Sequence, residues 1–554
     1  MAGGSARRSG GLGLAACLLW TLAFVWPSSH DTAIAQASPS PPSGAASFQT
    51  ASECMACHNS LTTSGGEDVS IGVSWRASMM AHSSRDPYWH AAVRRETIDH
   101  PEHAAAIEDE CSICHMPMTT YPARAAGRLG RVFEHLASGG RGGTPNVLAA
   151  DGVSCTVCHQ ITAERLGTPE SFTGGYVLNV TQPGQPAPMF GPFQVDDGRS
   201  HVMRSAIGVS PAEGLHVRQS ELCATCHTLF TQALDRDGRA IGRLPEQVPF
   251  LEWQHSAYRT SRSCQDCHMP AVEEPTPIAS VVGELREGWG RHTFLGGNFF
   301  MLRMLNRYRQ DLGVTAPSHE LEASASATER QLQRNTATVA IAEGAKTASN
   351  TTFTVVVENL TGHKLPTGYP SRRAWLHVTV RDRFGRVAFE SGATAPTGVI
   401  AGNDHDADGS RYEPHYEEIR AADQVQIYES VMVDARGAPT TGLLRGVRYA
   451  KDNRLLPRGF NKETASADVA IHGGAVADAD FGAGGDRVRY VLTLPDVQPP
   501  LTIHAELRFQ TIGYRWAQNL GAYDAAETKR FLTYYEAMAR GSSLVIAQAS
   551  ATVD

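Results

Sequence analysis

Hydrophobic and polar residues follow different patterns in the two halves of the chain. After residue 335, apolar β-branched and aromatic residues alternate with polar ones in the segments TFTVVVEN, RAWLHVTVRD, VQIYESVMVD, RVRYVLTLP and LTIHAELRFQ. Alternation with a period of two predicts half-buried strands, and turns such as RFGR separate the segments. We expect residues 335–554 to form an immunoglobulin-like β-sandwich with a helix near its end, at 524–540.

The first half shows little of this alternation. Short helical stretches such as DPYWHAAVRRE (86–96) lie between loops, and SHELEASASATERQLQR (318–334) has the pattern of a capped amphipathic helix. The sequence therefore predicts an α+β protein. Its parts would be a loop-rich, mostly helical domain at 38–317, a connecting helix at 318–334 and the β-sandwich domain at 335–554.

The N-terminus has the features of a secretory signal peptide. Arg7 and Arg8 precede an apolar stretch at 11–26, and an Ala-x-Ala pattern ends at Ala37. An uncleaved anchor is less favoured because the apolar run is shorter than the roughly 20 residues that span a bilayer. A lipoprotein site at Cys17 is also less favoured, because the apolar run continues past it. We expect cleavage of residues 1–37 and export to the periplasm or the cell surface.

The cysteines follow one motif. The chain has 11 cysteines, and all except Cys17 fall in five Cys-x-x-Cys-His sequences: CMACH, CSICH, CTVCH, CATCH and CQDCH. This motif is typical of c-type haem attachment, in which two thiols bond to one haem and the next histidine is the proximal ligand of its iron. The predicted attachment residues are Cys54, Cys57, Cys111, Cys114, Cys155, Cys158, Cys223, Cys226, Cys264 and Cys267, and the predicted proximal ligands are His58, His115, His159, His227 and His268.

Other uses of paired cysteines explain the pattern less well. A zinc site needs four ligands and does not require a histidine after every pair. A redox-active dithiol occurs once in a domain, and a disulfide framework does not repeat one spacing with a fixed histidine. Five repeats in an exported chain favour five covalently bound c-type haems.

Each iron has a second axial position. Nine further histidines lie between residues 52 and 300, and roughly half of them are expected to bind iron. The candidate distal ligands in this half are His82, His135, His201 and His292. In the second half, His363 lies among glycines and prolines, where a distal ligand and a structural turn histidine are equally supported. Methionines are alternative ligands: Met79, Met80, Met116, Met118 and Met203.

The stretch DHDADG (404–409) resembles the first half of a calcium loop. The glutamate expected at the twelfth position is replaced by His415. A solvated acidic loop is therefore the favoured interpretation, and calcium is the alternative.

Several segments around the motifs are similar to those of exported bacterial multihaem cytochromes of the broad cytochrome c-552/554 type. They are DPYW, CHMPM, DGVSCTVCH, ELCATCH, CQDCHMP and HTFLGGN. GHKLPTGYPSRRAWLHVTV and YAKDNRLLPRGF resemble a β-rich domain joined to such haem domains. The resemblance implies five haems in respiratory redox chemistry and supports the proximal ligands motif by motif.

Two functions fit these features. The first is electron transfer through haems with both axial positions filled. The second is a reductase with one open iron, acting on a nitrogen or sulfur oxyanion or on hydroxylamine; pentahaem nitrite reductases typically carry a lysine in one motif, and all five motifs here end in histidine. Expected partners are redox proteins, other multihaem cytochromes among them, and further copies of the chain, with only indirect membrane association. The net charge of −8 excludes a nucleic-acid binder.

Overall fold

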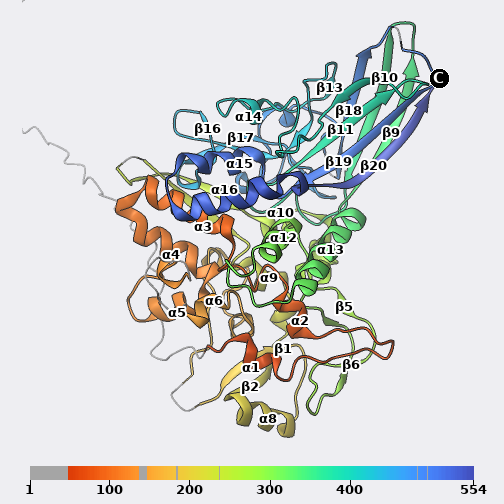
Figure 1. Ribbon diagram of the computed structural model, residues 1–554. Coiled ribbons are helices and arrows are strands. Elements are labelled where there is room, and N and C mark those ends of the chain that lie inside the picture. The colour runs from red at the N-terminus through yellow and green to blue at the C-terminus, as the bar shows by residue number, and fades with distance from the viewer. Residues whose placement is uncertain (1–47, 137–145, 182–184, 236, 483, 496) are drawn as a thin grey trace, which may run out of the picture. The chain divides into compact units, whose positions relative to one another are not determined.

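The computed structural model describes residues 48–136, 146–181, 185–235, 237–482, 484–495 and 497–554 (Figure 1). The predicted signal peptide at 1–37 lies outside these residues. The described residues all belong to one structural unit, Ser40–Asp554. Within them, no helix combines the length and the apolar character that crossing a membrane requires.

The region that carries the motifs is built from short helices joined by loops. Its longest helix before the connecting segment is α3, where Asp86 caps the N-terminus by accepting the backbone N–H groups of Tyr88 and Trp89, and Pro87 occupies the first turn. The helices are α1 (Ala51–Met55), α2 (Ile71–Arg76), α3 (Pro87–Asp99), α4 (Ala104–His115), α5 (Pro117–Ala125), α6 (Val147–Ala150), α7 (Cys155–Cys158), α8 (Asp197–Ile207), α9 (Ser220–Ala224), α10 (Pro249–Gln254), α11 (Cys264–His268) and α12 (Phe299–Arg307).

Short strands pair locally within this region. Their bounds are β1 (Ala187–Gly191), β2 (Val209–Glu213), β3 (Leu229–Leu234), β4 (Ala240–Gln247), β5 (Ala271–Val272), β6 (Thr276–Pro277), β7 (Leu285–Arg286) and β8 (Trp289–Gly290). The pairs are β1 with β2, β3 with β4, β5 with β8 and β6 with β7. Each of these sheets has two strands, so none supplies an extended core for the region.

Helix α13 (Ser318–Asn335) follows, where the connecting helix was expected. It packs beside α12, and Arg303 of α12 pairs with Glu322 and Glu329 of α13. Arg76 of α2 pairs with Glu320 at its N-terminal end. The helix is thus anchored to the motif region before the chain enters the sheets.

Two sheets form the framework of the second half. One has the order β13-β18-β10-β9, and the other has the order β12-β11-β19-β20, with β14 pairing to β11. Alternate residues of β18 and β19 are buried, as the period-two pattern predicted. The strands are β9 (Ala337–Lys346), β10 (Asn350–Asn359), β11 (Arg373–Arg381), β12 (Val387–Ser391), β13 (Glu418–Ile419), β14 (Ile427–Tyr428), β18 (Gly485–Thr493), β19 (Leu501–Gln510) and β20 (Ser543–Val553).

Smaller elements complete this half. A three-stranded sheet has the order β16-β15-β17. The predicted closing helix is α16, but the chain continues beyond it into β20, which pairs with β19. These elements are α14 (Asp404–Ala407), β15 (Ser430–Val433), β16 (Pro439–Thr440), β17 (Arg448–Asp452), α15 (Tyr514–Gln518) and α16 (Ala526–Met538).

One hydrophobic core crosses from the motif region into the sheets. Tyr88 of α3 and Phe299 of α12 belong to the same buried cluster as Val355 of β10 and Ile503 of β19. Figure 1 shows α16 beside α3, where Arg94 pairs with Glu527 at 3.0 Å. Separate helical and β-rich parts confirm the α+β class, and the shared core joins them.

Candidate haem-binding sites

Each Cys-x-x-Cys-His motif lies on a short helical turn. The second motif ends α4, the third forms α7, the fifth forms α11, and the first and fourth begin in α1 and α9. Residues three and four positions apart share a helix face, so the two cysteines and the histidine of each motif point the same way. The backbone N–H groups of His58, His159 and His227 donate to the carbonyl of the first cysteine of their motif at 3.0, 3.1 and 2.9 Å. No disulfide joins the ten motif cysteines, all of which lie among the described residues.

Four of the motif histidines donate their Nδ1–H to a backbone carbonyl. The pairs are His58 with Ile278 (2.6 Å), His115 with Ser83 (2.9 Å), His159 with Phe190 (2.6 Å) and His268 with Leu295. A carbonyl oxygen only accepts, so Nδ1 carries the proton and Nε2 keeps its lone pair. Metal-binding histidines are typically oriented in this way. The four rings are therefore in the tautomer that binds a metal through Nε2.

The fourth motif differs. Within the described residues, the ring of His227 has no carbonyl partner of this kind. Burial lowers the pKa of His227 to about 4, yet its side chain is exposed. The imidazole is neutral, which is the state that binds iron.

Two motif histidines face a second histidine at the spacing of an iron site. The ring centroids of His159 and His292 are 6.2 Å apart with planes 17° apart, and those of His268 and His363 are 6.2 Å apart with planes 20° apart. Two imidazole nitrogens at about 2.0–2.1 Å on either side of one metal ion would place the ring centroids about 6.3 Å apart. The residues thus fit an iron bound between each pair.

Both facing histidines also present Nε2. His292 donates Nδ1–H to the carbonyl of Gly290 at 3.0 Å, and His363 donates Nδ1–H to the carbonyl of Lys364 at 2.9 Å. Burial lowers the pKa of His292 to about 3 and that of His363 to about 4, so both rings are neutral. These are two of the five distal candidates from the sequence.

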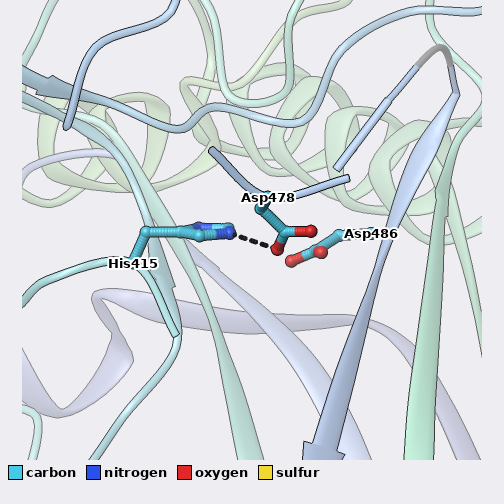
Figure 2. A group of neighbouring side chains, drawn as sticks. All are labelled: His415, Asp478 and Asp486. Carbon is cyan, nitrogen blue, oxygen red and sulfur yellow. Dashed lines mark hydrogen bonds and ion pairs between the residues drawn. The ribbon is translucent and has the colours of Figure 1, made fainter. Parts of the chain in front are cut away.

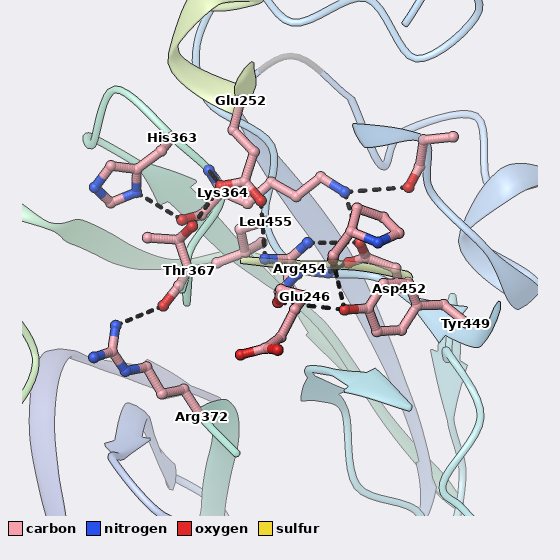
Figure 3. Close-up of polar contacts among 12 residues, drawn as sticks. Glu246, Glu252, His363, Lys364, Thr367, Arg372, Tyr449, Asp452, Arg454 and Leu455 are labelled. Atoms are coloured by element: carbon pink, nitrogen blue, oxygen red, sulfur yellow. Dashed lines mark hydrogen bonds and ion pairs between the residues drawn. The ribbon is translucent and has the colours of Figure 1, made fainter. Parts of the chain in front are cut away.

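A buried charge network holds the loop that carries His363. Lys364 donates from Nζ to Asp452 at 2.7 Å and from its backbone N–H to Glu252 at 3.1 Å (Figure 3). Arg454 bridges the same two acids, at 2.7 Å from Asp452 and 2.9 Å from Glu252. Because Glu252 lies on α10 of the motif region, the network fixes His363 relative to that region.

His82 has the signature of a third distal ligand. It is 2% exposed, and neither ring nitrogen makes a well-formed hydrogen bond among the described residues, although the backbone of Arg76 lies close to the ring. Burial lowers its pKa to about 3. Burying an imidazole without partners is costly, so both unpartnered nitrogens point to a missing ligand.

The structure places the other two candidates differently. His201 lies exposed on α8, with Nε2 3.4 Å from the hydroxyl of Ser205. His135 is half-buried and lines a cavity of about 190 Å³ together with His90, Arg85 and Asp311. Neither arrangement brings the ring opposite a motif histidine in the way seen for His292 and His363.

The motifs are close to one another in space. The thiol of Cys54 interacts with that of Cys155, the thiol of Cys114 with that of Cys226, and the thiol of Cys223 with that of Cys264. These contacts join the first motif to the third, the second to the fourth and the fourth to the fifth. Haems bonded to these sulfurs would lie edge to edge.

The calcium hypothesis gains no support from the 404–409 segment. Both carboxylate oxygens of Asp406 bind Arg373, at 2.8 and 2.9 Å, and Asp404 pairs with Arg411. Asp408 accepts the backbone N–H and hydroxyl of Ser410. The oxygens that would coordinate a cation are used within the protein.

A cluster of His415, Asp478 and Asp486 has metal-ligating side chains, but its hydrogen bonds are already made (Figure 2). Gln426 and Asn453 donate to Nδ1 of His415 at 2.9 and 3.0 Å, so Nε2 carries the proton and donates it to Asp478 at 2.9 Å. Burial raises the pKa of Asp486 to about 7. The cluster is a buried hydrogen-bond network that joins Asp486 of β18 to two loops.

Sequence reasoning missed the carbonyl groups that orient the motif histidines. Ile278, Phe190 and Leu295 are far along the chain from the histidines they contact. Any residue type supplies a carbonyl, so the sequence holds no signal for this role.

Comparisons with known proteins give one distant likeness. No family model matches the chain, and no curated protein matches it. The solved structure of a penta-heme cytochrome c552 from Thermochromatium tepidum is similar over 91% of this chain and 98% of that chain, with 15% sequence identity and a TM-score of 0.49. A likeness this distant assigns no residue of this chain.

Proposed function

We propose that this protein transfers electrons through five covalently attached c-type haems. The observation that carries the proposal is the pairing of His159 with His292 and of His268 with His363 at 6.2 Å in nearly parallel planes. Both axial positions of those two irons would be filled, which suits electron transfer because no position is open to substrate. His82 supplies a further neutral imidazole for this role.

The spacing of the motifs supports passage of electrons from haem to haem. Contacts between Cys54 and Cys155, and between Cys223 and Cys264, place the first attachment site beside the third and the fourth beside the fifth. Cys226 of the fourth motif also contacts Cys114. We infer an electron path in which the fourth haem has two neighbours, those of the second and fifth motifs. The protein sets each potential through ligand, burial and charge.

The setting of this function is also proposed. The predicted signal peptide supports action in the periplasm or at the cell surface, in respiratory electron transfer with redox proteins as partners. The two facing sheets of the second half support an immunoglobulin-like sandwich. Its role here includes holding His363 against the motif region, because His363 lies on the loop between β10 and β11.

A reductase is the second candidate, favoured by one cavity. Arg85, His135 and Asp311 line the space of about 190 Å³ that also borders Met116, next to the second motif. Arginine and histidine there suit the binding and protonation of a small oxyanion. This function requires one iron with an open axial position.

Two measurements on the full-length protein test the proposal. The intact mass should show five attached haems, and the reduced protein should show low-spin haem that does not bind carbon monoxide. One haem per protein binding carbon monoxide would favour the reductase, and fewer than five attached haems would contradict the proposed cofactor content.

A further inference from the structure

Arg372 is a half-buried cation whose two hydrogen-bond partners are neutral. Its Nη1 donates to the carbonyl of Thr367 at 2.7 Å (Figure 3), and its Nη2 donates to Oδ1 of Asn298 at 2.9 Å. Among the described residues, no carboxylate lies within ion-pair distance of the guanidinium. Burial lowers the pKa of Arg372 to about 10, with no acidic group opposing the effect.

The other cations of this loop and its surroundings are paired. Lys364 binds Asp452, and Arg454 binds Asp452 and Glu252. Arg373, the next residue in the chain, binds Asp406 at 2.8 Å. Moving a cation out of water costs roughly several kcal/mol when no anion lies beside it. The protein meets that requirement at Lys364, Arg373 and Arg454, so the unpaired guanidinium of Arg372 suits an anion from outside the chain.

The position of Arg372 shows where this anion lies. Arg372 lies at the end of the loop whose His363 faces His268, and its partner Asn298 closely follows Leu295, whose carbonyl accepts from His268. The loop closes tightly over it: Gly368 has φ +83°, and a Cβ there would come within 2.7 Å of Nη1. A guanidinium has five N–H donors, and two are used here. The remaining donors are free for a ligand near the fourth and fifth motifs.

We propose that Arg372, positioned by Asn298 and Thr367, binds a carboxylate, and that this carboxylate is a propionate of the haem attached at Cys264 and Cys267. The inference rests on the proposed function. An iron between His268 and His363 places that haem within reach of the loop 363–372, and the planar guanidinium binds a carboxylate with two parallel hydrogen bonds. A small carboxylate or oxyanion from solution would use the same donors, and the experiment separates the two sources.

The test is a redox titration of the individual haems between pH 5 and pH 9 in wild type, Arg372→Gln and Arg372→Lys. Arg436→Gln is the matched control, because it removes one positive charge from a side chain that is 78% exposed and far along the chain. The titratable groups that face Arg372 are His227, His268 and His363, and Glu252 lies beyond Thr367. The first three bind iron in the proposed function and do not titrate in this range.

At high pH, Arg372→Gln should lower the reduction equilibrium constant of one haem about tenfold, equivalent to about 59 mV for one electron. The ferric form is favoured because an unneutralised carboxylate remains. The difference from wild type should shrink toward low pH, because a buried carboxylate without a counterion takes up a proton. Arg372→Lys should give a smaller difference with the same pH trend, and Arg436→Gln should give none.

Three results would overturn the inference. A reduction potential that falls by the same amount at every pH in Arg372→Gln would show that Arg372 acts only as a charge, with no carboxylate bound. If Arg372→Gln does not mature, the same result in Arg372→Lys would overturn the inference. A wild-type potential that moves with added acetate at constant ionic strength would show a carboxylate from solution. If Arg372→Gln carries five haems with unchanged potentials, the carboxylate site at Arg372 is excluded and the proposed function still stands. Fewer than five haems in the wild type would instead contradict the proposed function.

Discussion

The motif region and the β-rich region bury their interiors in different ways. Between residues 48 and 317, many buried apolar side chains fall into small separate groups, such as Leu61, Val69, Val272 and Trp289. The strands of the second half contribute to one extended cluster that also takes in α12 and α13. A region without a continuous side-chain core needs another source of buried surface, and porphyrin faces supply it in a multihaem protein.

The same difference appears in the buried polar groups. In the β-rich region, the buried ionic groups Lys364, Arg373 and Arg454 are paired with carboxylates, and Arg372 is an exception. In the motif region, His82 is buried with both ring nitrogens unpartnered among the described residues. The β-rich region thus satisfies its buried side chains largely within the polypeptide, whereas in the proposed function the motif region is completed by its haems.

The largest expected effect comes from withholding the cofactors. Full-length chain made in a compartment without haem attachment should be cut by a dilute protease about ten times faster at 48–317 than at 335–554, because local stability there is low. Mass spectrometry of the fragments locates the cuts. The haem-loaded protein is the control, and equal protection of both regions without haem would contradict the contrast.

Removing His363 tests the point where the two regions share a site. His363→Ala should convert one of the five haems to a high-spin form that binds carbon monoxide, because His268 would be left as the only axial ligand. His292→Ala should do the same at His159. His504→Ala, on β19, is the matched control. A low-spin spectrum in His363→Ala would show that this histidine serves only the turn.

Breaking the network behind His363 should cost stability. The side chains of Lys364 and Asp452 are 0% and 3% exposed, and although burial opposes ionisation, Arg454 and Lys364 hold the pKa of Asp452 below its usual range. Asp452→Asn should lower the free energy of unfolding by about 3–5 kcal/mol, because two buried cations lose their shared partner. Chemical denaturation measures this.

The control for that network is an exposed pair. Asp434→Asn removes the partner of Arg436, which is 78% exposed, and should cost less than about 1 kcal/mol. Equal losses in Asp434→Asn and Asp452→Asn would show that the buried network has no special role.

Glu246 predicts a pH dependence of stability at the contact between the regions. It lies on β4, whose Pro245 carbonyl accepts the Tyr449 hydroxyl at 2.9 Å, and burial raises its pKa to about 8. A carboxyl whose pKa is raised on folding stabilises fully below its unfolded pKa, and the contribution is lost as pH rises through the folded pKa. Stability should therefore fall by about 1.4 kcal/mol per pH unit between about pH 4.5 and 8.

Glu246→Gln should remove that slope while keeping the hydrogen bond from Thr231. The exposed Glu287→Gln should keep the slope of the wild type. Thermal unfolding at several pH values compares the three proteins. A slope that survives in Glu246→Gln would assign the pH dependence to another group.

Local patterns in the sequence predicted much of the fold and part of the site. The alternating segments predicted β10, β11, β18 and β19, and the repeated spacing located the five motifs. The strand β20 was missed because a helix before it suggested the end of the domain. The order of strands in each sheet depends on long-range pairing, which a single sequence does not show.

The distal histidines show the limit more sharply. Composition gave His82, His135, His201, His292 and His363 similar standing as candidates. Only tertiary structure sets His292 and His363 opposite motif histidines and leaves His201 on the surface. Arg372 had no signal at all, because its isolation from carboxylates is a property of the folded chain.

Electron paramagnetic resonance of the oxidised full-length protein tests the central claim most directly. Axial imidazole planes 17° and 20° apart at the third and fifth motifs predict two rhombic low-spin ferric signals, and His363→Ala should remove one of them. High-spin ferric haem at either motif in the wild type, or two rhombic signals that persist in His363→Ala, would contradict the proposal that the β-rich region completes a haem site of the motif region.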